Sequence, residues 1–251
     1  MRQFMAEVRK TRYRKIWQGM LAIMAVQFVW CAWIFSRADA GELASGYYYA
    51  FLQVVIMNSI FLPVILAVAA SRIWDAEHKG NTWKLLGTLE TKAAIYRSKF
   101  LLGALYCLMM TSMQTVMLVL CANIFQFTQE MPVRHMVWFF VTVMAVDLML
   151  YLVQQILSMK YPNQLVALSV GLLGAFGGLF SYFFPAGLQK LVIWGYYGVL
   201  RSVDMYWDET TRISTYFERP MDYGFLGFVI LLTAALYWVG RQLFIREEYA
   251  S

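Results

Sequence analysis

The chain has 251 residues, of which 61% are hydrophobic and only 14% are charged, and its formal net charge is +6. Apolar runs of about 18 residues or more recur along it without the alternation typical of barrel strands, which excludes soluble domains and a transmembrane β-barrel. The basic residues lie mostly beside these runs, where lipid headgroups account for them, so the charge does not indicate nucleic acid. We therefore predict an all-α integral membrane protein with one transmembrane domain over residues 1–251.

The N-terminal third of the chain begins with a basic segment. Residues 1–15 hold six Lys or Arg and one acid, Glu7, which predicts a cytoplasmic amphipathic helix. The first span follows at 16–35, and it is too long for the hydrophobic part of a signal peptide, so we expect it to be retained. An external loop at 36–49 leads to the second span at 50–71, where Pro63 predicts a kink.

Residues 72–99 form the longest polar interruption in the first two-thirds of the chain. They hold six basic and three acidic residues, which predicts a cytoplasmic loop. Within it, Thr82 is placed to cap a short helix whose apolar side would be formed by Trp83, Leu85, Leu86 and Leu89. Such a helix can lie among lipid headgroups or fit a groove on a soluble partner.

The remaining apolar runs predict four further spans, at 100–124, 135–159, 164–184 and 223–244. Between the last two, residues 185–222 predict an external loop, with a re-entrant or interfacial element followed by a polar turn. With six spans, the predicted cytoplasmic segments carry 15 basic residues against 6 outside, which places both termini in the cytoplasm.

A few polar residues lie inside the predicted spans. Asp147 lies about halfway along the fourth span, where an ionisable group is expensive and usually faces the bundle interior. It can contact a cationic or polar substrate group or carry a proton, or it can be a structural acid bonded to Gln114, Gln154 or Gln155, and both alternatives stay open. For Asn58, Gln114 and Gln154 we favour interhelical hydrogen bonds over a substrate role.

Glycines mark one face of the fifth predicted span. Gly174 and Gly178 have the GxxxG spacing, and Gly171 extends the same small-residue face. Such a face permits close helix packing, either within one chain or with a second subunit.

Motifs for catalysis and for nucleotide or metal binding are absent from the sequence. It has no GxxxxGK[ST], no HExxH and no GxSxG, and its two histidines, His78 and His135, fall on opposite predicted sides of the membrane. The three cysteines lie inside apolar runs. We therefore predict no catalytic residue, no metal site and no cofactor bound by this chain.

The cytoplasmic loop resembles that of the permease subunits of ABC-2 type ABC transporters. The match consists of an acid-x-x-Gly-x-x-x-x-Leu-Leu pattern, then an aromatic residue and a Lys that opens the third span, at Glu77, Gly80, Thr82, Trp83, Leu85, Leu86, Tyr96 and Lys99. The sequence departs from the family at Glu90-Thr91-Lys92, where many members have Pro-Val/Leu-Ser/Thr-Arg. The glycine-rich run 157–179 and the aromatic segment 193–197 look like the small permeases of lantibiotic-immunity transporters.

The resemblance implies a mechanism and a location. Two permease chains, identical or paralogous, would assemble in a bacterial cytoplasmic membrane with two copies of a separate ATPase that binds ATP and Mg²⁺. The ATPase-coupling residues would be Glu77, Gly80, Thr82, Trp83, Leu85, Leu86 and Leu89. ATP-driven closure of the ATPases would expel an amphipathic, lantibiotic-type peptide from the membrane and so confer immunity.

Three alternatives differ in class. An ABC-2 permease for another cargo, such as a bacitracin-like, multidrug or haem-related compound, would keep the same architecture. A secondary transporter would be expected to show internal repeats, and we find none. A membrane enzyme or a regulatory scaffold would act without an ATPase, so co-purification of an ATPase separates it from the permease.

Overall fold

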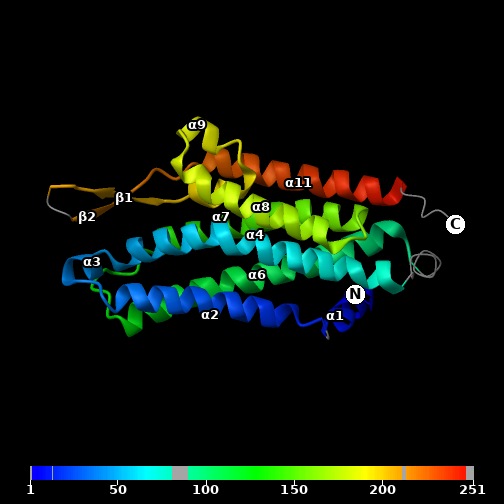
Figure 1. Cartoon of the computed structure of the whole chain (residues 1–251), viewed down its shortest axis with the longest axis horizontal. Helices are drawn as coiled ribbons and strands as arrows, with labels where there is room; N and C mark the ends of the chain where they lie inside the picture. The colour runs from blue at the N-terminus through cyan, green and yellow to red at the C-terminus, as the bar shows by residue number, and fades with distance from the viewer. Residues whose placement is uncertain (1, 13, 81–89, 211–212, 247–251) are drawn as a thin grey trace.

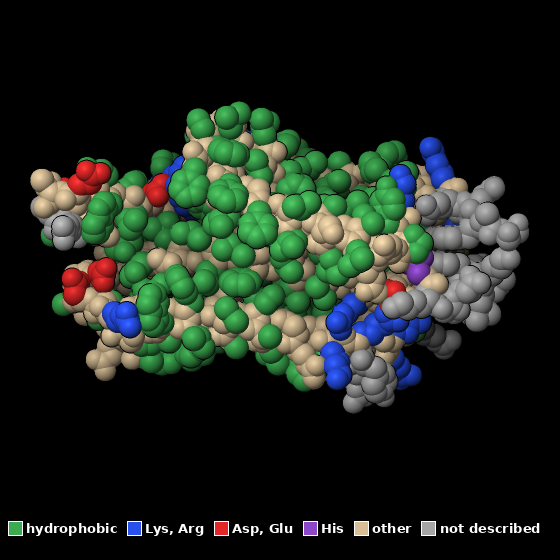
Figure 2. Space-filling view, in the orientation of Figure 1, with side chains coloured by type: hydrophobic (Ala, Val, Ile, Leu, Met, Phe, Trp, Pro, Cys, Tyr) green, Lys and Arg blue, Asp and Glu red, His purple; other side chains and the backbone are tan. Residues whose placement is uncertain are grey.

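Six long apolar helices form the body of the protein in the computed structural model, which describes all residues except 1, 13, 81–89, 211–212 and 247–251. They are α2 (Ile16–Phe35), α4 (Gly46–Gly80), α6 (Lys92–Ile124), α7 (Val133–Lys160), α8 (Gln164–Phe180) and α11 (Tyr223–Arg246). Each of the six, the fifth counted through Phe183, is long and apolar enough to cross a membrane, which confirms the six predicted spans. The helices run along the long axis of the molecule, and hydrophobic side chains cover the middle of its visible surface (Figures 1 and 2).

The two helices beside the predicted cytoplasmic loop are longer than expected. We predicted that the loop runs from Arg72 to Lys99, whereas α4 continues to Gly80 and α6 already begins at Lys92. The prediction was wrong at both ends because charged residues were taken as the limits of the helices. Several of these charges are instead paired within the bundle, as described below, and no Pro or Gly interrupts residues 72–79.

The molecule has two chemically different ends. At the α1 end, the amphipathic helix α1 (Arg2–Arg12) packs against α6 and α4, α11 ends on the opposite edge, and most of the visible Lys and Arg side chains gather there (Figures 1 and 2). At the hairpin end lies the short helix α3 (Ala40–Ala44), which begins with a capping box formed by Asp39 and Glu42. Most of the visible Asp and Glu side chains are at this end (Figure 2).

The segment between α8 and α11 begins with four short helical pieces. They are η1 (Ser181–Phe183), α9 (Ala186–Gln189), η2 (Ile193–Gly195) and α10 (Tyr196–Val199), and they fold back onto α8, α4 and α7. In the described part of this segment, no helix after Phe183 and before Tyr223 is long and apolar enough to cross a membrane, and the external re-entrant or interfacial element stays a prediction.

A two-stranded antiparallel hairpin follows, where we had predicted only a polar turn. Strand β1 (Val203–Trp207) pairs with β2 (Ser214–Glu218), from Val203 opposite Glu218 to Trp207 opposite Ser214. The acids and threonines of 208–211 indicate a polar turn, but the β-branched and aromatic residues on either side of them favour strands. Two such runs around a polar turn are the usual signal of a hairpin.

Large aromatic side chains are buried where α4, α6, α7 and α11 meet toward the α1 end. Trp74, Tyr96, Tyr151 and Phe244 are among the largest fully buried side chains, and Trp74 packs edge-on against Phe244 at 5.3 Å between ring centroids. This aromatic cluster lies against the polar groups described next.

Candidate functional site

The predicted ATPase-coupling residues fall partly outside the described part of the chain. Thr82, Trp83, Leu85, Leu86 and Leu89 belong to residues 81–89, and the structure therefore does not test their predicted helix. Glu77 and Gly80 lie in the last turn of α4, which leads directly into this connection. The described part of the candidate site therefore consists of the end of α4, the start of α6 and the residues that pack against them.

A buried cluster of four charges joins those helices to α1. The Lys99 ammonium donates to Glu7 at 3.1 Å, to Glu77 at 3.3 Å and to the carbonyl of Ile73 at 3.1 Å. Lys10 donates to Glu77 at 2.8 Å and to Glu7 at 3.1 Å. Two ammonium groups therefore share two carboxylates, and the cluster connects α1, the end of α4 and the first turns of α6.

The cluster is nearly closed to solvent. The side chain of Lys99 is 0% exposed, those of Glu77 and Glu7 are 2% and 8% exposed, and only Lys10 reaches the surface at 36%. Burial by itself lowers the pKa of Lys10, but its bonds to Glu77 and Glu7 outweigh that effect and raise it. The charges balance, so each one depends on the others for its stability in the protein interior.

A second pair fixes the connection between α1 and α2. Arg14 donates to the Asp75 carboxylate at 3.1 Å and to the carbonyl of Arg72 at 2.9 Å, and Arg72 in turn donates to the carbonyl of Arg14. Asp75 is buried and lies two residues before Glu77 on α4. The end of α4 is therefore bonded to the N-terminal segment through two nearby residues, Asp75 and Glu77.

The amide side chains in the middle of the bundle form their own closed group. Asn58 and Gln114, both predicted as intramembrane polar residues, meet Gln27 of α2. Gln27 donates to Asn58 at 3.0 Å, Asn58 to Gln114 at 3.2 Å and Gln114 to Gln27 at 3.0 Å, and all three are 0% exposed. This ring of bonds joins α2, α4 and α6. Gln27 was not singled out in the sequence, although a glutamine inside an apolar run was the available signal.

Asp147 is fully buried and bonds to partners that we did not predict. Tyr197 of α10 donates to its carboxylate at 2.5 Å, and Thr111 of α6 donates at 3.4 Å. The expected structural partners were glutamines, and that pairing was wrong because the segment after α8 folds back and brings Tyr197 to this depth. The carboxylate therefore connects the segment after α8 to the bundle.

Gln154 and Gln155 are adjacent on α7, but their side chains have different surroundings. With its amide oriented to fit its neighbours, Gln154 donates to the carbonyl of Ala167 at 3.0 Å and accepts from the amide of Gly171 at 3.3 Å. It thus links α7 to α8. Gln155 is 0% exposed, and its amide atoms have no hydrogen-bond partner among the described residues.

The glycine face of α8 is occupied within the chain. A Cβ on Gly174 would lie 2.2 Å from the Trp194 ring, and one on Gly178 would lie 2.7 Å from the Trp194 carbonyl oxygen. A Cβ on Gly171 would lie 2.6 Å from Ala67 of α4. The close approach expected for this face is therefore intrachain, which is one of the two alternatives that the sequence left open.

Another group of polar contacts lies at the hairpin end. His135, at the start of α7, lies 3.0 Å from the Ser202 hydroxyl through Nδ1 and 3.3 Å from the Glu218 carboxylate through Nε2. Tyr48 donates to the same carboxylate at 2.5 Å, and this bond is the main cause of the lowered pKa of Glu218. These contacts fasten β2 to α4 and α7.

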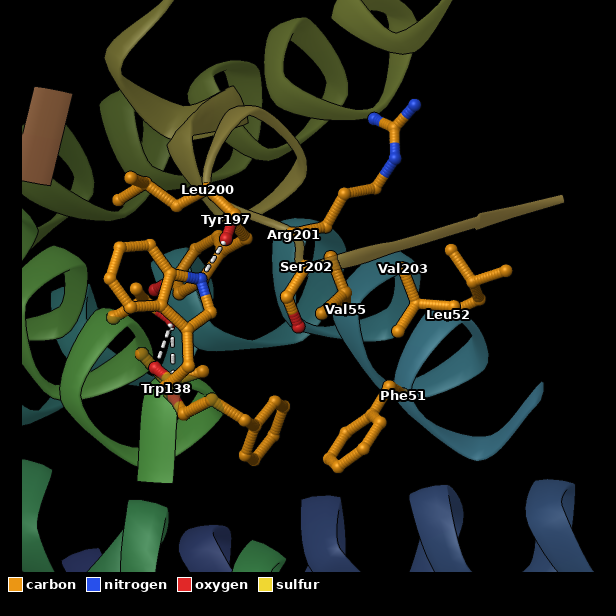
Figure 3. A pocket seen from close by; sticks show the side chains of 12 residues that line it. Phe51, Leu52, Val55, Trp138, Tyr197, Leu200, Arg201, Ser202 and Val203 are labelled. Carbon is orange, nitrogen blue, oxygen red and sulfur yellow. Dashed lines mark hydrogen bonds between the residues drawn. The ribbon is translucent and has the colours of Figure 1, made fainter. Parts of the chain in front are cut away.

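A small cavity of about 20 Å³ lies beside these contacts (Figure 3). Ser202 points its hydroxyl into it, and Trp138 closes one side by donating to the carbonyl of Leu200 at 2.7 Å. Arg201 extends its guanidinium away from this cavity (Figure 3) and also lines a larger one. Groups of three or more His, Cys, Asp or Glu that could hold a metal ion do not occur in the described part of the chain.

The comparisons with known proteins agree with this architecture. The model of one family, described as ABC-2 family transporter protein, matches residues 4–178. This range includes α1, the buried charge cluster, both helices around residues 81–89 and most of α8. No curated protein and no solved structure matches the chain. Family membership and the six apolar helices make this a multi-pass membrane transport component, of a kind that in general works with an ABC ATPase. The chain belongs to the ABC-2 family of transporter proteins.

Proposed function

We propose that this chain is the permease subunit of an ATP-driven exporter in a bacterial cytoplasmic membrane, and that its cargo is an amphipathic antimicrobial peptide of the lantibiotic type. Two permease chains, identical or paralogous, would assemble with two ATPase subunits, with both termini in the cytoplasm. Removal of the peptide from the membrane would protect the cell that carries the exporter.

The observation that carries the ATP-driven part of the proposal is the buried cluster of Glu7, Lys10, Glu77 and Lys99. It ties α1 to both helices that lead into residues 81–89. If an ATPase displaced that connection, α1 would move with it. Because Arg14 bonds to Asp75, the start of α2 would move as well. The buried charges serve here as positioning groups, and the apolar residues Trp83, Leu85, Leu86 and Leu89 would contact the ATPase.

The charge distribution supports a cationic cargo. In the six-span topology, the segments at the hairpin end carry eight acidic and six basic residues, whereas the rest of the chain is strongly basic. A cationic peptide leaving the outer leaflet would meet a surface of opposite net charge, which favours encounter. The alternative cargo, a bacitracin-like or multidrug compound, would use the same coupling.

Affinity purification of the tagged full chain in mild detergent, followed by mass spectrometry, tests the coupling. We expect an ATPase to co-purify with the wild-type chain and to be lost in Trp83→Ala but retained in Trp207→Ala. Trp207 is the matched control because it is 49% exposed on the hairpin, at the opposite end of the molecule. Recovery of the chain alone would contradict the proposal.

Survival of cells that express the complete transporter then separates the cargoes. Protection against lantibiotics but not bacitracin supports the peptide cargo proposed here. Protection against bacitracin alone would replace it with the second cargo.

A further inference from the structure

A second cavity, of about 140 Å³, lies at the base of the hairpin. It is bounded by the first turns of α4, by η1 and by both strands, and its lining includes Tyr49, Gln53, Tyr182, Met205 and Tyr216. Neither the family match, which ends at residue 178, nor the proposed coupling accounts for it. We refer to it as the tyrosine cavity.

Its aromatic walls are held in place before any ligand arrives. The rings of Tyr49 and Tyr216 stack with their centroids 5.2 Å apart. The Tyr182 hydroxyl lies 3.1 Å from the Ser59 hydroxyl and donates to the carbonyl of Val55 at 3.3 Å, so its polar end is already bonded to α4. Aromatic walls with fixed positions are typical of preformed binding sites.

Two charged residues, Arg201 and Asp204, also line the cavity, and they are paired with each other. Arg201 donates to the Asp204 carboxylate at 2.7 Å, and Arg219 reaches the same carboxylate at 3.5 Å. Arg201 also lies over the Tyr182 ring at 5.7 Å. The interior of the tyrosine cavity therefore favours an apolar group over an ion.

Two acids lie near one wall of the tyrosine cavity, although they do not line it. Burial is the main cause of the raised pKa of the Tyr216 hydroxyl, and Tyr49 and the carboxylates of Glu42 and Asp39 raise it further. Both acids belong to the capping box at the start of α3. In the six-span topology the segments at this end carry eight acidic and six basic residues, so an apolar group carried by a positively charged molecule meets a surface of opposite net charge there.

We propose that the tyrosine cavity binds one apolar side chain, aromatic or branched aliphatic, of a cationic amphipathic peptide. A cavity of about 150 Å³ takes up a group the size of benzene, so the space suits a single side chain and not a folded peptide. The inference rests on the proposed function and deepens it, because it assigns a contact site for the exported peptide at the outer face.

Cysteine protection in the full chain tests this site directly. Met205 lines the tyrosine cavity and is 44% exposed, whereas its neighbour Tyr206 does not line it and is 64% exposed. The three native cysteines are buried, so a water-soluble maleimide should label mainly the introduced thiol. We would compare Met205→Cys with Tyr206→Cys in lipid nanodiscs, with and without a purified lantibiotic as the probe.

With the peptide at ten times its dissociation constant, we expect labelling of Met205→Cys to slow about tenfold and that of Tyr206→Cys to stay unchanged. Equal protection of both positions would mean that the peptide covers the whole hairpin, and protection by lipid alone would make a lipid chain the occupant. Either result overturns the proposal, as does the absence of protection at Met205→Cys.

A second comparison uses affinity. Tyr216→Ala should weaken binding of the same peptide about tenfold, whereas Tyr206→Ala, on the neighbouring strand, should leave it unchanged. If neither variant changes binding while the ATPase still co-purifies and cells stay protected, the tyrosine cavity is not the site but the proposed function stands. If protection at Met205→Cys is seen without any ATPase partner, the site stands and the ATP-driven function fails.

Discussion

The two ends of the molecule use charged residues in opposite ways. At the α1 end, Lys99, Glu7 and Glu77 are buried and bonded to one another across three helices. At the hairpin end, Glu218 and Asp222 are 56% and 43% exposed and make contacts at the surface. A closed, balanced cluster holds helices in a fixed relation, whereas charges that lie partly exposed at the surface can interact with a ligand. Under the proposed function, the α1 end would transmit the movement of the ATPase and the hairpin end would contact the peptide.

The strongest way to break this comparison is to remove the central charge of the cluster. Lys99→Met should destabilise the protein by about 3–5 kcal/mol, because Glu7 and Glu77 stay buried with too little positive charge. Thermal unfolding in detergent measures this effect. Arg97→Met is the matched control, since Arg97 lies on the same helix but is exposed, and it should change stability little.

A double variant sharpens this result. Adding Glu77→Gln to Lys99→Met should recover part of the lost stability, because one unbalanced carboxylate is removed. If the double variant is instead less stable than Lys99→Met alone, charge balance is not what holds the cluster together.

A substitution on the glycine face of α8 ranks second. Gly178→Ala would place a Cβ 2.7 Å from the backbone oxygen of Trp194, and we expect a loss of about 1–3 kcal/mol from overpacking. At the adjacent Gly177 the nearest atom to a new Cβ would be 3.9 Å away, so Gly177→Ala should be neutral or stabilising. The melting temperature should therefore fall in Gly178→Ala and stay unchanged or rise in Gly177→Ala. Similar losses in both would mean that Trp194 does not pack on this face.

Loss of the contact between α10 and α7 should have a smaller effect. Tyr197→Phe removes the 2.5 Å bond to Asp147 and leaves the carboxylate only the longer bond from Thr111, which should cost about 1–2 kcal/mol. Tyr223→Phe is the control, because its hydroxyl is exposed and contacts only the Met221 sulfur at 3.4 Å. Hydrogen exchange in residues 193–200 should rise in Tyr197→Phe alone, and equal exchange in both variants would contradict a fastening role for Asp147.

Acid should loosen the hairpin, with the smallest effect. The hydrogen bond from Tyr48 and the charge of His135 lower the pKa of Glu218, so its contribution is complete above its ordinary value of about 4.3 and is lost as pH falls through the lower folded value. Because this side chain is 56% exposed, we expect well under about 1 kcal/mol. Hydrogen exchange of residues 203–218 should rise below about pH 4. Glu218→Gln should remove most of this dependence, whereas Glu209→Gln should retain it.

The sequence alone determined the class of the protein, the number of apolar helices and their approximate positions. About 20 apolar residues in a row can hardly be accommodated except as a buried or membrane-spanning helix, so local composition decided those elements. The pattern from Glu77 to Lys99 also indicated the family that the comparison confirmed over residues 4–178. These features depend on neighbours along the chain, which a sequence displays directly.

Only the tertiary structure decided which polar groups meet. Glu7 and Lys99 are 92 positions apart in the sequence, and Tyr197 lies 50 positions from Asp147, yet each pair forms a buried bond. Similarly, Trp194 fills the glycine face of α8 because the chain turns back after η1. Buried charges and cavities arise from contacts between distant segments, and no local pattern encodes the partner. For this reason the helices could be predicted from composition, whereas the charge cluster and the tyrosine cavity required the fold.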